Sequence, residues 1–446
     1  MDLDAIFKAY DVRGMVPAEL DEEAARRIGF AFARFADADR IVVGRDVRSS
    51  SPVLAAGIGD GIRAADVDVT DLGMTTTDMV YFASGHLDLP GVMITASHNP
   101  KGYNGIKLCL AGAAPVGADS GLVDVRALAA EDPPSHLAGA YRTDDILDAY
   151  LDHMLMVGGA GSISGLRVAV DGGNGVAGVA IPSIFDRIDA DLVGLFLDPD
   201  GTFPNHHPDP MRPENLIDLK ALMAREHLDL GVAFDGDADR AFFVDDAGDA
   251  LPGSTITAML ATWFLAQNSG ASIVHNLICS KAVPEAIAAA GGTSVRARVG
   301  HSYIKQIMKD TDAVLGGEHS GHYYFRSNYR ADSGILAMLI LMRIVSESDR
   351  PLSELRCQFE PYVQSGEINM AVADTAAEID RVANAFTGFD RLDGLTVDLG
   401  DRWFNLRPSN TEPVLRLNVE ASTTEAVEEL VELVRSHIQE VDGDGV

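Results

Sequence analysis

The chain contains 446 residues, and its 67 acidic and 35 basic side chains give a formal net charge of −32. A charge of this sign makes a nucleic-acid groove or an anionic membrane surface an unfavourable partner, and no stretch approaches the ~18 uninterrupted apolar residues of a membrane span. Three isolated cysteines and an N-terminus without an export signal argue against disulfides and zinc, and they predict a cytoplasmic protein.

The first part of the chain alternates short apolar runs rich in Val and Ile with helical stretches. The runs at 41–44, 67–72 and 91–94 follow this pattern, which is typical of a layered α/β unit with a mostly parallel sheet. The third run leads into Thr95-Ala-Ser-His-Asn-Pro100. The hydroxyl of Ser97 therefore stands where a strand ends, in a loop that we expect to face solvent.

Ser97 could act either in group transfer or in capping a helix. Ser and Asn before Pro often cap helices. A serine is a poor nucleophile unless its proton is withdrawn or it already carries the transferable group. The surrounding residues do not form the Gly-x-Ser-x-Gly elbow of a Ser-His-Asp hydrolase.

The same α/β pattern recurs in the second part. The run at 166–170 leads into a glycine-rich turn, and the run at 230–234 leads into Asp235-Gly-Asp-Ala-Asp-Arg240. The carboxylates of this segment, which belong to Asp235, Asp237 and Asp239, would repel one another, and a divalent cation is the usual way to stabilise such a cluster. A hydrated turn is the alternative.

The acidic segment does not fit an EF-hand loop, because Arg240 and Asp246 occupy the positions that require glycine and glutamate. Oxygen ligands alone favour Mg²⁺ over zinc or copper. A hydroxyl and a hard-metal site are together the two halves of phosphoryl-transfer chemistry.

A third α/β unit contains a strand-like run at 272–278, a helix at 284–290 and the segment Gly317-Glu-His-Ser-Gly-His322. After 359–361 the pattern changes. Runs at 368–372, 395–399 and 414–419, with helices at 375–386 and 424–438, predict a separate, smaller α+β domain.

Joints near Thr143, in the turn at 245–249 and at 359–361 divide the chain into domains 1–143, 144–248, 249–360 and 361–446. The last of these carries Arg407-Pro-Ser-Asn-Thr411, which offers a guanidinium, two hydroxyls and loop amides to an anion. A simple turn before the next strand is the alternative.

The four segments that begin at Thr95, Asp235, Gly317 and Arg407 resemble, in this order, the motifs of the α-D-phosphohexomutases. Lys8-Ala-Tyr-Asp-Val-Arg-Gly14 adds to this resemblance. The chain is most similar to their bacterial phosphomannomutase/phosphoglucomutase branch, nearly from end to end. The resemblance implies four domains around a central cleft, of which three are alike, with one motif from each domain.

The resemblance also implies the chemistry of the site. The serine matching Ser97 is phosphorylated in active members of the family, and a phosphoserine carries about −1.5 to −2 charge at neutral pH. Mg²⁺ would be held by one oxygen at Ser97 and by the carboxylates of Asp235, Asp237 and Asp239, with Arg240 beside the same charge. Transfer to the sugar gives a hexose 1,6-bisphosphate, which is also the expected activator.

Further roles are implied by matching positions. Glu318 and Ser320 match residues that bind the sugar hydroxyls in both orientations. His98 is expected to orient the serine loop, and proton transfer is left open between Lys107 and His322, with Arg13 as a further candidate. Contacts to the substrate and its distal phosphate are expected from Lys281, His301, Arg407, Ser409, Asn410 and Thr411.

The resulting hypothesis is a Mg²⁺-dependent phosphohexomutase that interconverts hexose 1-phosphate and 6-phosphate, with mannose preferred and glucose as a second sugar, acting as a monomer or homodimer. A phosphoglucosamine mutase is an alternative, although His319 and Asn410 stand where that branch usually has Gln and Gly. A metal-dependent phosphatase and a catalytically silent phosphosugar-binding regulator are further alternatives.

Overall fold

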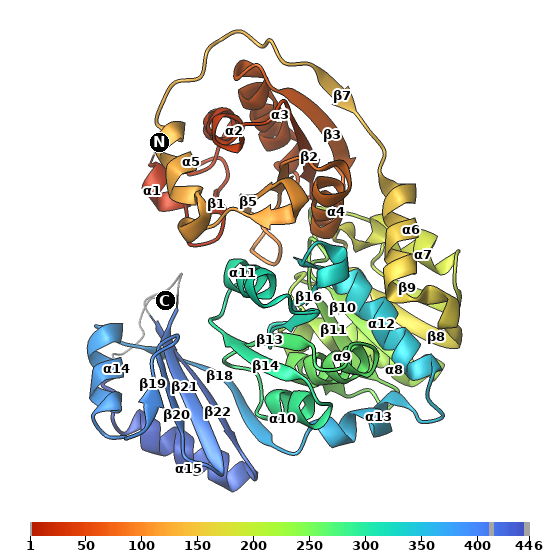
Figure 1. The fold of residues 1–446 in the computed structure, drawn as a ribbon, viewed down its shortest axis with the longest axis vertical. Helices are drawn as coiled ribbons and strands as arrows, with labels where there is room; N and C mark the ends of the chain where they lie inside the picture. The colour runs from red at the N-terminus through yellow and green to blue at the C-terminus, as the bar shows by residue number, and fades with distance from the viewer. Residues whose placement is uncertain (1, 410–413, 441–446) are drawn as a thin grey trace.

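The computed structural model describes residues 2–409 and 414–440. Its sheets divide the chain into four successive parts, which Figure 1 shows from the red N-terminal part to the blue C-terminal part. The predicted fold class, three similar α/β domains followed by a smaller α+β domain, is confirmed.

The first part builds a mixed sheet from β1 (Val12–Met15), β2 (Arg40–Arg45), β3 (Asp68–Met74), β4 (Gly91–Ile94), β5 (Tyr103–Leu110), β6 (Ala114–Pro115) and β7 (Tyr141–Thr143). Its helices are α1 (Leu3–Ile6), α2 (Glu22–Ala36), α3 (Ser51–Ala64), α4 (Thr77–Leu87) and α5 (Leu122–Ala129).

The second part contains β8 (Ser164–Asp171), β9 (Asp189–Leu195), β10 (Leu230–Phe234), β11 (Ala241–Asp245) and β12 (Ala250–Leu251), with helices α6 (Leu147–Gly158), α7 (Ile181–Phe185) and α8 (Ile217–Glu226). The third part contains β13 (Ser272–Asn276), β14 (Thr293–Ala297), β15 (Leu315–Gly317), β16 (Tyr323–Phe325) and β17 (Ala331–Asp332), with α9 (Gly253–Gln267), α10 (Ala282–Ala289), α11 (His301–Thr311), α12 (Gly334–Ser346) and α13 (Leu352–Leu355).

One strand arrangement occurs in each of these three parts. The neighbours run β3-β2-β4-β5 in the first sheet, β9-β8-β10-β11 in the second and β14-β13-β15-β16 in the third. In each case the first three strands are parallel and the fourth is antiparallel. The turn between the third and fourth strands therefore occupies the same place in all three sheets.

The fourth part is an antiparallel sheet formed by β18 (Val363–Ala371), β22 (Val414–Ala421), β21 (Arg402–Pro408), β20 (Leu395–Asp398) and β19 (Phe389–Asp390). Its helices are α14 (Thr375–Ala383) and α15 (Thr424–Arg435). Both are shorter than predicted. At the start of α10 the difference is opposite, since the helix begins at Ala282, two residues before Pro284. The first helical turn accepts proline because proline lacks an N–H group, and a backbone N–H at that position would have no partner within the helix.

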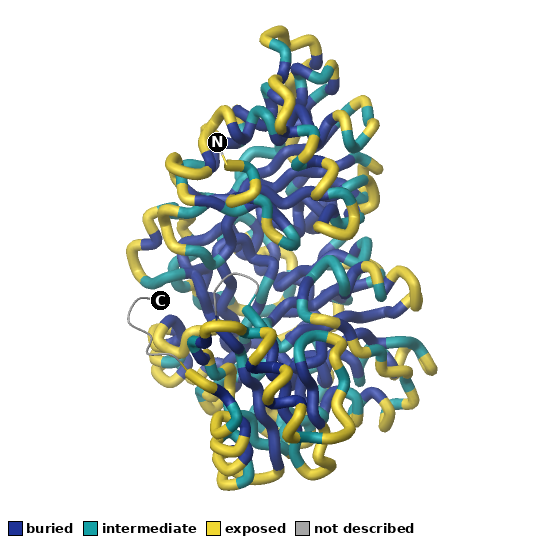
Figure 2. The backbone as a smooth tube through the Cα atoms, turned by 90° about the vertical axis from the view of Figure 1, so that its left-hand side faces the viewer, coloured by how far each residue is buried: buried dark blue, intermediate teal, exposed yellow. Residues whose placement is uncertain are grey.

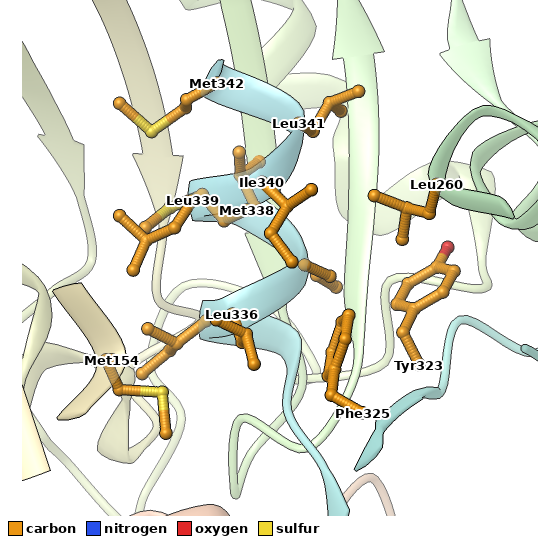
Figure 3. Close-up of a cluster of buried hydrophobic side chains, with 14 of the residues drawn as sticks. Met154, Leu260, Tyr323, Phe325, Leu336, Met338, Leu339, Ile340, Leu341 and Met342 are labelled. Atoms are coloured by element: carbon orange, nitrogen blue, oxygen red, sulfur yellow. The ribbon is translucent and has the colours of Figure 1, made fainter. Parts of the chain in front are cut away.

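The apolar helix α12 joins the first three parts. Its residues 334–342 are all apolar and buried, as expected of a helix that packs on every side, and the charged Arg343 lies in its last, partly exposed turn. Figure 3 shows them beside Met154 of α6, Leu260 of α9 and Phe325 of β16. The same buried cluster includes Phe82, from α4, so one hydrophobic core extends through three sheets.

The fourth part has a core of its own. Its buried cluster runs from Met370 to Ile438, and no buried apolar cluster of the described residues contains side chains from both the third and the fourth part. Figure 2 shows buried backbone inside each part and exposed residues on the outer helices and loops. No helix in the described ranges is both long and apolar enough to cross a membrane.

Acid is expected to destabilise this fold through His275 of β13. Burial lowers the pKa of its imidazole to about 4, whereas the unfolded chain titrates near its ordinary value, so the unfolded state binds more protons as the pH falls. Stability present above pH ~6.5 is lost as the pH falls towards 4, by about 3 kcal/mol.

Urea unfolding between pH 4 and 7.5 gives the free energy of unfolding of the wild type and of His275→Gln at each pH. The contribution of His275 is the difference between the slopes of the two proteins when this free energy is plotted against pH. His136→Gln, which changes an exposed histidine, serves as the matched control. Equal slopes for the wild type and His275→Gln would contradict the expectation.

Candidate active site

The three turns that occupy equivalent places in the sheets carry three of the sequence motifs. Ser97 follows β4, Asp235 follows β10 and Glu318 follows β15. The first two turns meet: Ser97 Oγ donates a hydrogen bond to Asp235 Oδ2 at 2.6 Å, across 138 residues of sequence. The second and third turns also meet, since Ala241 N donates to Gly321 O at 3.2 Å.

Ser97 itself is buried, with 1% of its surface exposed, whereas the loop is exposed to solvent only at residues 100–102. The reason for this burial is the turn from the second part, which packs against Ser97: a Cβ on Gly236 would lie 2.5 Å from Ser97 O. The helix-capping alternative is wrong, because a turn and then β5 follow Ser97. The backbone of Ser97 is left-handed, with φ of 49°.

The three carboxylates predicted as metal ligands are brought together. Asp235, Asp237 and Asp239 are at most 1% exposed, and each has a carboxylate oxygen within 4.8 Å of the others. Oδ1 of Asp237 and Oδ1 of Asp239 are buried without a hydrogen-bond partner. Carboxylate oxygens that lie this close together without hydrogen-bond partners are suitable ligands for a hard divalent cation such as Mg²⁺.

The charges in the cluster differ from one carboxylate to the next. Burial, reinforced by Asp239 and Asp237, raises the pKa of Asp235 well above its ordinary value. Burial acts the same way on Asp237, but the ammonium of Lys107 and the hydroxyl of Thr77 hold its pKa below the usual range. The cluster thus combines a carboxyl that resists ionisation with one that stays ionised.

Lys107 lies against two of these carboxylates. Its Nζ is 2.8 Å from Asp237 Oδ2 and 2.5 Å from Asp239 Oδ2. Burial favours the neutral amine, but the two carboxylates outweigh it and raise the pKa of Lys107 well above the ordinary value. In this arrangement Lys107 is a charge partner of the acidic cluster and holds its proton firmly.

His322 reaches the same cluster from the third part. Its Nδ1 lies 2.9 Å from Asp332 Oδ2 and 3.8 Å from Asp239 Oδ1. Asp332 is also paired with Lys305, whose Nζ lies 2.8 Å from Asp332 Oδ1. Asp332 therefore orients the imidazole through a hydrogen bond, and Asp239 lies near the same nitrogen.

His98 and the two predicted arginines surround Ser97. The Nδ1 of His98 lies 3.0 Å from Ser97 Oγ, and the charge of Arg240, followed by burial, lowers the pKa of His98 well below its ordinary value. Arg240 Nε is 3.7 Å from Asp235 Oδ2. Arg13 donates to Ala96 O at 2.8 Å and also bonds the side chain of Asn99.

The predicted sugar-binding residues lie in the turn after β15. Glu318 is buried and accepts hydrogen bonds from Tyr324 OH at 2.5 Å, Asn276 Nδ2 at 3.1 Å and Gly300 N at 3.3 Å. Ser320 is partly exposed in the same turn. His301 begins α11, and its Nδ1 is buried without a hydrogen-bond partner.

The predicted phosphate anchor lies in the fourth part. Arg407 is 4% exposed, and its Nη2 donates to Glu367 Oε2 at 2.7 Å. Ser409 ends the described stretch, whereas Asn410 and Thr411 lie outside the described residues. The Nζ of Lys281 is engaged with Asp398 Oδ1 at 2.8 Å and Gly400 O at 2.9 Å, so Lys281 joins the third part to the fourth.

Several residues at this site were not predicted. They include Asp332 and Lys305 around His322, Thr77, which donates to Asp237 Oδ2 at 2.6 Å, and the pair Asp46 and Arg48 beside the Ser97 loop. The signal for the last pair was available: Asp46-Val-Arg48 directly follows β2, a parallel neighbour of β4, and ligand sites gather at the carboxyl ends of such strands.

Comparison with known proteins agrees with this architecture. The families described as phosphoglucomutase/phosphomannomutase alpha/beta/alpha domains I, II and III match residues 4–123, 148–248 and 252–362, and the C-terminal domain of the same description matches 367–437. Every part of the fold is thus matched in order.

Relatives are similar along most of the chain. A phosphomannomutase of Salmonella montevideo is 42% identical over 93% of this chain and 94% of its own, and a protein of Xanthomonas campestris pv. campestris named "Phosphohexose mutases" is 41% identical over the same shares. A crystal structure of a phosphoglucomutase/phosphomannomutase family protein from Burkholderia thailandensis superposes with a TM-score of 0.90, at 34% identity, over 98% of this chain and 97% of that one.

Proposed function

Because this chain belongs to the phosphoglucomutase/phosphomannomutase family and is a phosphohexomutase, we propose that it interconverts the 1-phosphate and 6-phosphate of mannose in the cytoplasm, with glucose as a second sugar. The observation that carries this proposal is the 2.6 Å contact between Ser97 Oγ and Asp235 Oδ2. It joins a transferable hydroxyl to a buried carboxylate cluster. The names of the curated relatives favour mannose.

The residues that would hold Mg²⁺ are Ser97, through a phosphate oxygen, and the carboxylates of Asp235, Asp237 and Asp239. The buried, unpartnered oxygens of Asp237 and Asp239 support this assignment. A bound divalent cation would neutralise part of the charge on the phosphoryl group and polarise its phosphorus.

The protein's own groups position the serine and the sugar phosphate. Arg240 lies beside Asp235 and adds positive charge where the transferred group must sit. Lys107 neutralises two carboxylates of the cluster. The high pKa of Lys107 makes it a poor base, so we assign proton transfer at the sugar hydroxyl to His322, oriented by Asp332.

Each catalytic cycle requires the sugar to bind in two opposite orientations, since Ser97 gives its phosphoryl group to the free hydroxyl at one end of the hexose and then accepts the other phosphoryl group, which the substrate already carried at the opposite end. The hexose 1,6-bisphosphate formed between the two steps would also reload an unphosphorylated Ser97. Glu318 and Ser320 would bind hydroxyls common to both orientations, while Arg407, Ser409, Asn410 and Thr411 would hold the distal phosphate.

Incubation with mannose 1-phosphate, Mg²⁺ and a catalytic amount of glucose 1,6-bisphosphate tests the proposed function. We expect mannose 6-phosphate to form with almost no inorganic phosphate, because the phosphoryl group returns to Ser97 instead of passing to water. Glucose 1-phosphate and glucosamine 1-phosphate, run in parallel, rank the sugars.

Stoichiometric release of phosphate in this assay would make the protein a phosphatase. Faster turnover of glucosamine 1-phosphate than of mannose 1-phosphate would assign it to the phosphoglucosamine mutases instead. Binding of the sugar phosphate without turnover would favour a silent regulator.

A further inference from the structure

Arg48 is a fully buried cation next to the Ser97 loop. It follows the end of β2, has 1% of its surface exposed and is paired with Asp46, whose Oδ2 lies 3.2 Å from Arg48 Nε. Asp46 in turn accepts from Arg48 N at 2.9 Å and from the hydroxyl of Ser51. A guanidinium held this rigidly offers its remaining N–H groups in a fixed plane.

Those N–H groups all donate to backbone carbonyls of the serine loop and of the first residue of β5. Nη2 donates to Ser97 O at 2.7 Å and Asn99 O at 2.6 Å, and Nη1 donates to Pro100 O at 2.9 Å and Tyr103 O at 3.0 Å. One side chain therefore binds the turn at Ser97 and the start of β5 at the same time.

The loop needs such support because Ser97 has an unfavourable backbone conformation. A left-handed φ costs a residue with a Cβ roughly 1–2 kcal/mol and persists only where the surroundings determine it. Thr95 Oγ1 accepts a hydrogen bond from Ser97 N at 2.9 Å, and Arg48 donates to the carbonyl oxygen of Ser97. Together they fix both peptide groups of Ser97.

The second part of the chain closes over Arg48. A Cβ on Gly201 would lie 2.9 Å from the Cα of Arg48, and the ring centre of Phe203 lies 5.4 Å from its guanidinium carbon. Gly236, which adjoins the acidic cluster, packs on the carbonyl oxygen that Arg48 binds. Arg48 thus lies where the serine loop and the part carrying the acidic cluster come together.

We propose that Arg48 is a positioning residue for phosphoryl transfer, which fixes the Ser97 loop by binding three of its carbonyl groups and one at the start of β5, and so sets the serine oxygen against Asp235. This inference rests on the function proposed above. Asp46 neutralises the guanidinium, so the effect of Arg48 is on geometry more than on charge. A displacement of about 1 Å at a reacting group can cost about 10²-fold in rate.

Arg48→Lys is the informative substitution, because it keeps the charge but replaces a planar fork by a single ammonium that cannot bind four carbonyls in one plane. We expect kcat with mannose 1-phosphate to fall by about 10²-fold while KM changes by less than about threefold, since Arg48 touches the loop and not the sugar. In Arg48→Ala, guanidinium ion added at low millimolar concentration should restore part of the lost kcat.

Arg356 provides the matched control. It is also held by carboxylates and carbonyls, with Nη1 2.7 Å from Asp245 Oδ2 and Nη2 3.0 Å from Ala250 O, but it does not contact the serine loop. Arg356→Lys should keep the wild-type kcat, and guanidinium should leave the rate of Arg356→Ala unchanged.

Four results would overturn the inference. They are an Arg48→Lys variant with near wild-type kcat, a loss expressed in KM instead of kcat, an Arg48→Ala variant that guanidinium does not rescue, and an unfolded circular dichroism spectrum for both Arg48 variants while the Arg356 variants fold. The last result would make Arg48 a residue of the whole fold. A wild-type chain inactive in the same assay would instead overturn the proposed function itself.

Discussion

Ser97→Ala is expected to abolish mutase turnover while leaving the fold intact. The substitution removes the oxygen that, in the proposed mechanism, donates one phosphoryl group to the sugar and accepts the other from it, so kcat should fall by a factor on the order of 10⁴ to 10⁶. The fold should be kept because the substitution removes a single oxygen atom, whose hydrogen-bond partners are Asp235 and His98. A coupled assay for mannose 6-phosphate measures the loss.

Intact-mass measurement after incubation with glucose 1,6-bisphosphate gives an independent result for the same variant. The wild type should gain one phosphate and Ser97→Ala none. Ser120→Ala, which changes an exposed serine of the same domain, should behave as the wild type in both measurements. A Ser97→Ala protein with more than a few per cent of wild-type kcat would disprove the role of Ser97.

Asp235→Asn should have opposite effects on activity and on the stability of the metal-free protein. Because the pKa of Asp235 is raised well above its ordinary value by burial, this carboxyl contributes stability that is fully present below the unfolded pKa and is lost as the pH rises through the folded pKa. Removing this charge should raise the melting temperature without metal. The same change removes a proposed ligand and should lower kcat by about 10² to 10³-fold.

Thermal melts with and without MgCl₂ separate the two effects. A concentration of ~5 mM should saturate a site formed by carboxylate and phosphate ligands. The wild type should gain melting temperature on adding Mg²⁺, and Asp235→Asn should gain little. Asp189→Asn, an exposed position at the start of β9, is the control. An unchanged Mg²⁺ effect in Asp235→Asn would exclude Asp235 as a ligand.

The strands that carry the two principal motifs could be predicted to the residue. β4 and β10 are buried along their whole length, and such strands appear in sequence as unbroken apolar runs ended by polar residues. The run at 272–278 was less well defined, since the strand ends at Asn276 and its last two apolar residues lie in the following turn. Apolar character alone does not distinguish a buried turn from a strand.

The environment of Ser97 could not be predicted, because it depends on residues distant in sequence. Its burial follows from the packing of Gly236, and its carbonyl is bound by Arg48 from a different loop. The same holds for Lys107, whose spacing from Asp237 and Asp239 in sequence gives no sign of the ion pairs they form. The local sequence pattern therefore predicts which groups are reactive. Their charge states depend on contacts that form only in the tertiary structure.

The separate core of the fourth part has a consequence for how the enzyme could release its ligand. The described bonds that join it to the third part are polar, and they include those from Lys281 to Asp398, Arg296 to Asp390 and Val299 N to Asp393. Moving the fourth part, which carries Arg407, away from the third part would replace these bonds by hydrogen bonds to water and would expose little apolar surface. Separating the first three parts would instead expose their common apolar interior, so among the described contacts the boundary between the third and fourth parts opens with the smaller loss of buried apolar surface.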